Sequence, residues 1–297
     1  MKRTTLFKKL IMNEDILVMP VAYDAVAAKI TEQVGFKAIA LGGYATSASL
    51  LGKPDMSLLT LTEIVNHARN IAEAVSIPVF ADGDTGHGNV INVIRMVREL
   101  EKAGLAGFFI EDQVFPKRCG HLEGKQVVAA EEMIAKIKAA VDTREDPDFV
   151  IMARTDALAI YGLDEAIDRA NKYREAGADL LFVEAPTSKE EMIRINEEIN
   201  GPTMAIQGEG AKTPLVNVKE LESLGYSVVV YPGSALYAAA WAVRKVMEEL
   251  LAKGTTAGYL NKMLTFNDFN HMIGLPEVME KEKYYYMDLL DKTSHLT

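Results

Sequence analysis

Short, almost wholly apolar runs recur along the chain and alternate with longer stretches in which apolar residues are spaced three and four apart. Each run is four to six residues long, and most are rich in Val, Ile and Phe. Such runs are typical of parallel β-strands that are buried on both faces. We therefore predict eight strands, within residues 16–20, 37–42, 78–82, 107–112, 149–154, 179–184, 203–207 and 227–232.

The stretches between these runs have helical periodicity, with apolar residues on one face. Glycine, the common residue just past a helix C-terminus, stands where four of the predicted helices end: Gly35, Gly104, Gly177 and Gly225. Eight strand–helix units predict an α/β fold of the closed (β/α)8 or TIM-barrel type, which needs roughly 250 residues. An open doubly wound sheet is the alternative, but its phosphate-binding glycine pattern does not follow the first run.

The last part of the chain breaks this rhythm. Residues 255–297 contain helical patterns but no strand-like run. We predict a single barrel domain over residues 1–297, of which 255–297 form a C-terminal helical extension. Because this extension is rich in apolar residues, we expect it to pack on a neighbouring surface, such as that of an oligomer partner.

Composition narrows the picture by exclusion. The 297 residues carry 32 Lys and Arg against 42 Asp and Glu, a net charge of −10, which argues against nucleic-acid binding. No apolar stretch is long enough for a membrane span, and residues 2–9 fit a helix better than a membrane anchor. A single cysteine excludes an intrachain disulfide, and the start has no signal-peptide core. We expect a cytoplasmic protein that contacts neither nucleic acid nor membrane.

Acidic residues follow several predicted strands. Asp82 and Asp84 end the third strand, Glu111 ends the fourth, and Asp55 lies in the loop after the second. A barrel brings the carboxyl ends of its strands together, so these carboxylates would repel one another without a cation. Oxygen ligands of this kind suit Mg²⁺ or Mn²⁺ better than Zn²⁺. An EF-hand is excluded because its twelfth position would be Val93, while a single strand-end acid could also be solvated or cap the next helix.

The loop after the fourth strand carries the lone cysteine. Cys119 stands beside Lys117, Arg118 and His121, and neighbouring positive charge favours a thiolate. We therefore predict that Cys119 exchanges a proton near neutral pH, although a nucleophilic role and an inert buried thiol both remain open. Gly120 would allow the backbone to approach a ligand closely or to bend as a lid closes.

Arg154 ends the fifth predicted strand, and Glu184 ends the sixth. A buried arginine at this place needs either an internal salt bridge or an anionic ligand. Because guanidinium groups bind carboxylates in a bidentate manner, we predict a substrate that bears a carboxylate.

Five segments, in this order and spacing, resemble the isocitrate lyase/phosphoenolpyruvate mutase superfamily. The resemblance spans about residue 5 to about residue 285, and the Lys-Arg-Cys-Gly-His sequence within it marks the carbon–carbon lyase branch. The segments are Ala-Asp-Gly-Asp-Thr-Gly-His-Gly (81–88), Ile-Glu-Asp-Gln (110–113), Pro-Lys-Arg-Cys-Gly-His (116–121), Ala-Arg-Thr-Asp-Ala (153–157) and Phe-Val-Glu-Ala-Pro (182–186).

This resemblance implies a barrel whose last helix is exchanged between paired subunits, usually within a homotetramer. It also implies Mg²⁺ near Asp82, Asp84 and Glu111, held partly through water, with Asp55 in the outer shell. Cys119 would protonate an enolate carbon. The remaining implied site residues are Gly42, Gly43, Tyr44, Gly120 and Arg154 toward the substrate, and Lys117, His121 and Glu184 around the gated pocket.

The implied activity is magnesium-dependent retro-aldol cleavage of a 2-hydroxy di- or tricarboxylate to pyruvate or another α-keto acid. A 2,3-dimethylmalate-like substrate is favoured over 2-methylisocitrate, because the His-Arg-Pro-Asn-Lys sequence associated with the latter is here His121 to Lys125, with Leu122 in place of the arginine. The second hypothesis keeps this scaffold but changes the chemistry to oxaloacetate decarboxylation or hydrolysis, or to that of carboxyphosphonoenolpyruvate mutase. The third hypothesis is a catalytically silent barrel that acts as a binding or assembly module. Pro232 stands where oxaloacetate-hydrolysing relatives are expected to carry Ser. Ile206 and Gln207 replace a usual Asn, and we assign Gln207 to the substrate contacts.

Overall fold

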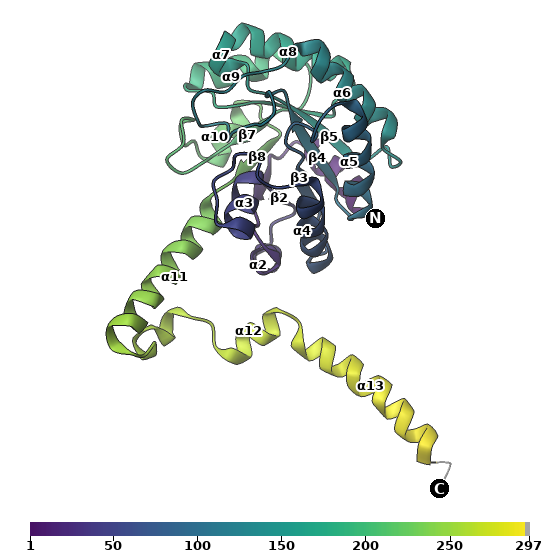
Figure 1. The fold of residues 1–297 in the computed structure, drawn as a ribbon, viewed down its shortest axis with the longest axis vertical. Helices are drawn as coiled ribbons and strands as arrows, with labels where there is room; N and C mark the ends of the chain where they lie inside the picture. Colours follow the sequence, from purple (N-terminus) through teal and green to yellow (C-terminus); the bar gives the residue numbers. More distant parts are fainter. Residues whose placement is uncertain (295–297) are drawn as a thin grey trace. The chain divides into compact units, whose positions relative to one another are not determined.

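The computed structural model describes residues 1–294, and its strands lie inside the predicted runs except for Thr155, one residue beyond the fifth run (Figure 1). All pairings between neighbouring strands are parallel. The strands are β1 (Leu17–Pro20), β2 (Ile39–Leu41), β3 (Val79–Asp82), β4 (Gly107–Glu111), β5 (Val150–Thr155), β6 (Leu180–Val183), β7 (Met204–Ile206) and β8 (Val228–Tyr231).

These strands form a closed barrel. One sheet has the order β2-β3-β4-β5-β6 and the other the order β1-β8-β7. Isolated parallel bridges join the two sheets on both sides, Val21 with Ala40 and Leu181 with Thr203. The predicted (β/α)8 barrel is therefore confirmed, with helices around the ring of strands in Figure 1.

Helices fill the connections between the strands, and α1 precedes the first one. The helices of the barrel are α1 (Arg3–Ile11), α2 (Ala25–Val34), α3 (Gly43–Leu51), α4 (Leu61–Ala74), α5 (Val90–Lys102), α6 (Ala130–Thr143), α7 (Leu158–Tyr161), α8 (Leu163–Glu175), α9 (Lys189–Glu198) and α10 (Val218–Ser223). Among the described residues no helix is both long enough and apolar enough to cross a membrane.

Helix α5 illustrates why these segments fold as they do. Asn89 caps its first turn by accepting a hydrogen bond from the backbone N–H of Ile91. Its apolar positions, spaced three and four apart, form a face that is buried against the sheet. The chain leaves the helix at Gly104, whose φ of 82° suits glycine.

Two apolar clusters stabilise the barrel. One lies between the strands and the surrounding helices. The other joins alternate strand residues to α1, with the fully buried Phe7 as one of its members. The ring of Phe7 lies 5.3 Å, centroid to centroid, from that of Phe80. Helix α1 therefore contributes buried side chains to the apolar core of the barrel.

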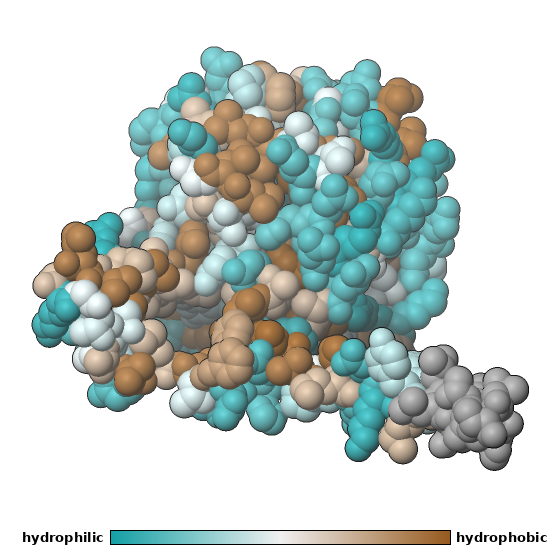
Figure 2. All heavy atoms as spheres, turned by 60° about the horizontal axis from the view of Figure 1, so that its bottom comes forward, coloured by the Kyte–Doolittle hydropathy of each residue, from teal (hydrophilic) through white to brown (hydrophobic). Residues whose placement is uncertain are grey.

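The chain divides into two compact units, Met1–Tyr237 and a second that starts at Ala238. Helix α11 (Ser234–Lys253) runs across this boundary and is followed by η1 (Ala257–Lys262), α12 (Phe266–Met272) and α13 (Leu275–Ser294). The described part of the second unit is helical and exposes many large apolar side chains (Figure 2). The predicted single domain with an extension over 255–297 stays a prediction.

Phe7→Ala should lower the free energy of unfolding by about 3–5 kcal/mol, since it removes a fully buried aromatic ring and leaves a cavity. Urea denaturation followed by circular dichroism measures this change. Met12→Ala, at a position that is 68% exposed just after the same helix, is the matched control and should change stability little. A loss below about 1 kcal/mol for Phe7→Ala would contradict the role given to α1.

Candidate active site

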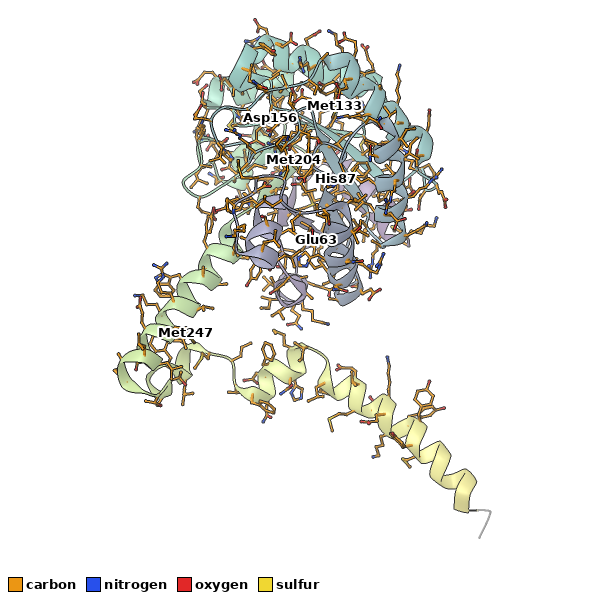
Figure 3. All side chains as sticks on the ribbon, in the orientation of Figure 1. Glu63, His87, Met133, Asp156, Met204 and Met247 are labelled. Carbon is orange, nitrogen blue, oxygen red and sulfur yellow. The ribbon has the colours of Figure 1, made fainter. Side chains whose placement is uncertain are left out.

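A cavity of about 280 Å³ lies at the carboxyl ends of the strands. Met204 from β7 lines it, and in Figure 3 this residue lies inside the ring of helices. Most residues predicted for the site line this cavity: Gly42, Gly43, Tyr44, Asp55, Asp82, Lys117, Cys119, Gly120, His121, Arg154, Glu184 and Pro232. Three predicted residues are not part of its wall: Asp84, Glu111 and Gln207.

Asp82 is fixed by two backbone donors. Its Oδ2 accepts a hydrogen bond of 2.8 Å from the N–H of Gly43, and its Oδ1 accepts one of 2.8 Å from the N–H of Asp84. A Cβ atom on Gly43 would lie 2.8 Å from Asp82 Oδ2 and 3.2 Å from Lys117 Nζ. Only glycine allows the start of α3 to approach these charged groups so closely.

Lys117 reaches into the acidic cluster from the loop after β4. Its Nζ lies 2.7 Å from Asp55 Oδ2 and 2.9 Å from Asp84 Oδ1. Burial disfavours the ammonium, yet the surrounding carboxylates, Asp84 first, raise the pKa of Lys117 well above its usual value. Burial also raises the pKa of Asp84 to about 6, although Lys117 opposes that shift. Lys117 therefore remains charged and compensates part of the buried negative charge.

Glu111 adds a further buried carboxyl group. Burial raises the pKa of Glu111 well above its usual range, even though Arg154 opposes the shift. Its Oε2 lies 3.3 Å from Arg154 Nη1, while Oε1 has no hydrogen-bond partner among the described residues. The cluster thus holds more carboxyl groups than its cations satisfy.

An all-oxygen donor set with surplus negative charge suits a hard divalent cation. The donors at the strand ends are carboxyl oxygens of Asp82, Asp84 and Glu111, with Asp55 bound to Lys117. Nevertheless, among the side chains that the structure describes, no three from His, Cys, Asp or Glu are arranged to ligate an ion directly. The chemistry of the donors therefore fits a hard divalent cation, although the described side chains do not form a ready three-ligand site.

Arg154 is surrounded by carboxylates. Asp156 accepts hydrogen bonds of 2.9 Å from its Nε and 3.0 Å from its Nη2, and Glu184 Oε2 lies 3.1 Å from its Nη1. The internal salt bridge that the sequence left open as an alternative is therefore present. Burial alone would lower the pKa of Arg154, but Asp156, Glu111 and Glu184 raise it well above its usual value. The guanidinium is charged and held in a fixed orientation.

The prediction that neighbouring positive charge favours a thiolate at Cys119 is wrong. Burial raises the pKa of the Cys119 thiol and Glu184 raises it further, while a hydrogen bond from the backbone of His121 and the charge of Arg154 oppose the shift. The adjacent cations do not promote a thiolate, because Lys117 points to Asp55 and Arg118 donates to the backbone oxygen of Glu123. At neutral pH Cys119 is a neutral thiol at the cavity wall, which suits a proton donor.

The rest of the loop closes around the thiol. The Nε2 atom of His121 lies 3.4 Å from Glu184 Oε1. A side chain at Gly120 would collide with the guanidinium of Arg154 and with Glu184. Close approach of the backbone, one of the two functions predicted for this glycine, is thus what the structure requires.

The prediction that Gln207 contacts the substrate is also wrong. Its Oε1 accepts a hydrogen bond of 2.6 Å from the N–H of Val216, and its Nε2 lies 3.3 Å from the carbonyl oxygen of Pro214. The side chain therefore fixes the loop after β7 instead of contacting a substrate. Ile206 lines the cavity in its place.

Sequence reasoning missed Tyr237, at the start of α11. Its hydroxyl group donates to that of Tyr44 at 3.2 Å, and burial raises the pKa of Tyr237 to about 12. Both tyrosines line the cavity. Nothing in the local sequence marks Tyr237, because its position depends on how the last strand leads into the helix.

The sequence profile of the phosphoenolpyruvate phosphomutase family matches residues 7–251, and the chain belongs to this family. It is 50% identical over 278 residues to 2,3-dimethylmalate lyase of Eubacterium barkeri, covering 94% of this chain and 96% of that enzyme. It is 41% identical over 275 residues to 2-methylisocitrate lyase of Aeropyrum pernix, covering 93% and 88%. The predicted assignment to the carbon–carbon lyases of the superfamily, and so to the enzymes, is confirmed.

Solved structures of the PEP mutase/isocitrate lyase superfamily share the fold of this chain. A crystal structure of 2,3-dimethylmalate lyase, described as a PEP mutase/isocitrate lyase superfamily member, has a TM-score of 0.91, 34% identity and 96% coverage of both chains. Oxaloacetate acetylhydrolase with 3,3-difluorooxalacetate has a TM-score of 0.91 and 32% identity, covering 96% of this chain and 97% of that one. The structure of phosphonopyruvate hydrolase with oxalate and Mg²⁺ has a TM-score of 0.88 and 29% identity, covering 96% of this chain and 100% of that one.

Labelling of Cys119 by iodoacetamide tests the neutral thiol. In protein treated with EDTA, we expect the labelling rate to rise with pH to a midpoint above about 8.5, the value of an unperturbed thiol. Protein unfolded in guanidinium is the control and should show the unperturbed midpoint. Since Cys119 is the single cysteine, Cys119→Ser should not label at all. A midpoint near 7 in the folded protein, as for activated thiolates, would contradict this assignment.

Proposed function

We propose that this protein cleaves a carbon–carbon bond of a 2,3-dimethylmalate-like 2-hydroxy dicarboxylate, releasing pyruvate or another α-keto acid and a carboxylate. The observation that supports this most directly is that Cys119, whose thiol pKa is raised by burial, lines the same cavity as Asp82, Lys117 and Arg154. The 50% identity to 2,3-dimethylmalate lyase over 94% of the chain supports the same substrate class.

The cation that fits the site is Mg²⁺, with Mn²⁺ as the alternative, near Asp82, Asp84 and Glu111. When bound, such a cation would stabilise the negative charge that develops on an enolate during cleavage. The related phosphonopyruvate hydrolase was solved with oxalate and Mg²⁺, which supports a divalent ion in this chain. Lys117 adds a fixed positive charge beside the same carboxylates.

The chain's own residues supply orientation and a proton. Arg154 would orient a substrate carboxylate, because its guanidinium is fixed at the cavity wall. Cys119 would then donate its proton from Sγ to the enolate carbon, forming the new C–H bond. The loop that carries Cys119 forms part of the wall and would limit the access of water to the reacting carbon.

The charge of the cavity wall favours a dicarboxylate over a tricarboxylate. Of the described residues that line the cavity, Lys117 and Arg154 carry fixed positive charges, and both are already paired with carboxylates. The wall beside β7 and β8 is apolar, with Ile206, Val230 and Pro232. This surface fits the alkyl groups of a dimethylmalate but offers no partner to a third carboxylate.

We further propose that the helical second unit packs on other copies of the chain, in a homotetramer with exchanged helices. Its exposed apolar side chains support this proposal, since Trp241 is 63% exposed and Leu251 91% exposed in a single chain. Contiguous apolar surface of this kind is typical of subunit interfaces.

Turnover of racemic 2,3-dimethylmalate with Mg²⁺, coupled to detection of pyruvate, tests the proposed activity. EDTA should abolish turnover, and Cys119→Ser should reduce it by about 100-fold or more because the proton donor is lost. Arg118→Ala, an exposed position in the same loop, is the matched control and should retain activity. Undiminished pyruvate formation after EDTA treatment and in Cys119→Ser would refute the proposal.

Light scattering tests the assembly. A tetramer of 32.6 kDa chains has a mass of four times that value, and Trp241→Glu combined with Leu251→Glu should reduce it because both charges would be buried. Met12→Glu, at another exposed position, should leave the mass unchanged. A monomeric unmodified protein would contradict the proposed assembly.

A further inference from the structure

The loop that carries Cys119 is closed at its base. Its two ends pair as a short antiparallel ladder, in which Gln113 bridges Val127 and the N–H of Val114 donates to Gln126. The tip between these ends extends over the cavity. Lys125 lies next to this ladder, at the point where the tip returns to the barrel.

The side chain of Lys125 is turned inward. Its Nζ lies 2.7 Å from Asp156 Oδ1, and the two side chains are 3% and 0% exposed. Lysine is rarely buried in this way, because removing an ammonium from water is costly unless a carboxylate compensates it. This ion pair therefore requires the base of the loop to be in the position seen here.

Asp156 is also the residue that orients Arg154. Its two carboxylate oxygens accept hydrogen bonds from Nε and Nη2 of Arg154, a bidentate arrangement that fixes the plane of the guanidinium. Asp156 is itself held from behind, since its backbone N–H donates to Asp112 Oδ1 at 2.9 Å. Asp112 in turn accepts hydrogen bonds from Thr155 and Tyr173.

One oxygen of Asp156 thus serves two cations, Lys125 from the loop and Arg154 from the cavity wall. Arg154 is paired with Glu111 and Glu184 as well. When Lys125 is present, it shares the negative charge of Asp156 and leaves more of the positive charge of Arg154 for an incoming carboxylate. Without the Lys125 contact, Arg154 would face three carboxylates with no other cation among the described residues sharing the charge of Asp156.

We propose that Asp156 is a positioning residue that couples the closed loop to the readiness of Arg154 for a carboxylate ligand, with Lys125 as the link. The identity of the ligand rests on the proposed function, but the coupling itself does not. By linkage, closure that strengthens ligand binding must be favoured by the ligand to the same degree.

Iodoacetamide labelling of Cys119 at one pH measures loop opening without any turnover. Lys125→Met removes the charge but keeps the length of the side chain, and we expect it to raise the labelling rate about tenfold or more, since Asp156 loses a buried partner. Lys125→Arg keeps the charge and should restore the slow rate. Lys212→Met is the matched control: it removes an exposed ion pair with Glu123 of the same loop and should change the rate little. Labelling of Lys125→Met at the wild-type rate would overturn the proposal.

A double-mutant cycle of Lys125→Met and Asp156→Asn shows whether the two residues act together or independently on the labelling rate. If the two residues act together, Lys125→Met combined with Asp156→Asn labels no faster than the faster single variant. Multiplied effects would overturn the coupling. Should Asp156→Asn fail to fold, the Lys125 variants alone decide the outcome.

Oxalate with Mg²⁺ serves as the carboxylate probe. The oxalate concentration that halves the labelling rate should rise about tenfold in Lys125→Met and return toward normal in Lys125→Arg. If this oxalate concentration were unchanged in Lys125→Met, Lys125 would only hold the loop in place, and the proposed link to Arg154 would be overturned. Because neither readout involves cleavage, a protein that does not turn over dimethylmalate would refute the proposed function without touching this coupling.

Discussion

The barrel buries more carboxyl groups at the ends of β3 to β6 than its own cations can neutralise. Lys117 and Arg154 each contact at least two of them, and yet burial still raises the pKa values of Asp84 and Glu111. Such a surplus is relieved either by protonation or by a further positive charge, which the proposed divalent cation would supply. This imbalance explains why Gly43 and Gly120 approach charged groups closely, why two lysines of the loop point inward, and why the site fits a divalent cation.

The loop after β4 supplies positive charge that compensates part of this surplus of carboxyl groups. Lys117 enters the acidic cluster, Lys125 reaches Asp156, and Gly120 passes against Arg154 without a side chain. Each of these contacts brings the loop closer to the cavity, where Cys119 becomes part of the wall. The contacts that compensate the buried charge therefore also place the thiol at the cavity wall.

The fold could be predicted from sequence because parallel strands buried on both faces give continuous apolar runs, and those runs match β1 to β8. Most of the site followed, since a barrel gathers its strand ends at one place whatever the details of the loops. The protonation state of Cys119 could not be predicted, because it depends on where Lys117 and Arg118 point and not on their nearness in sequence. Gln207 was misassigned because neighbouring residues of a strand face opposite sides, and the sequence alone did not reveal which of Ile206 and Gln207 faces inward.

The most direct test of the acidic cluster as a cation site facing a thiol is a crystal structure of the protein grown with Mg²⁺ and oxalate. We expect one ion beside Asp82, within reach of Asp84 and Glu111 directly or through water, with oxalate between that ion and the sulfur of Cys119. An empty cluster, or a sulfur atom that faces away from the bound oxalate, would contradict this view of the site.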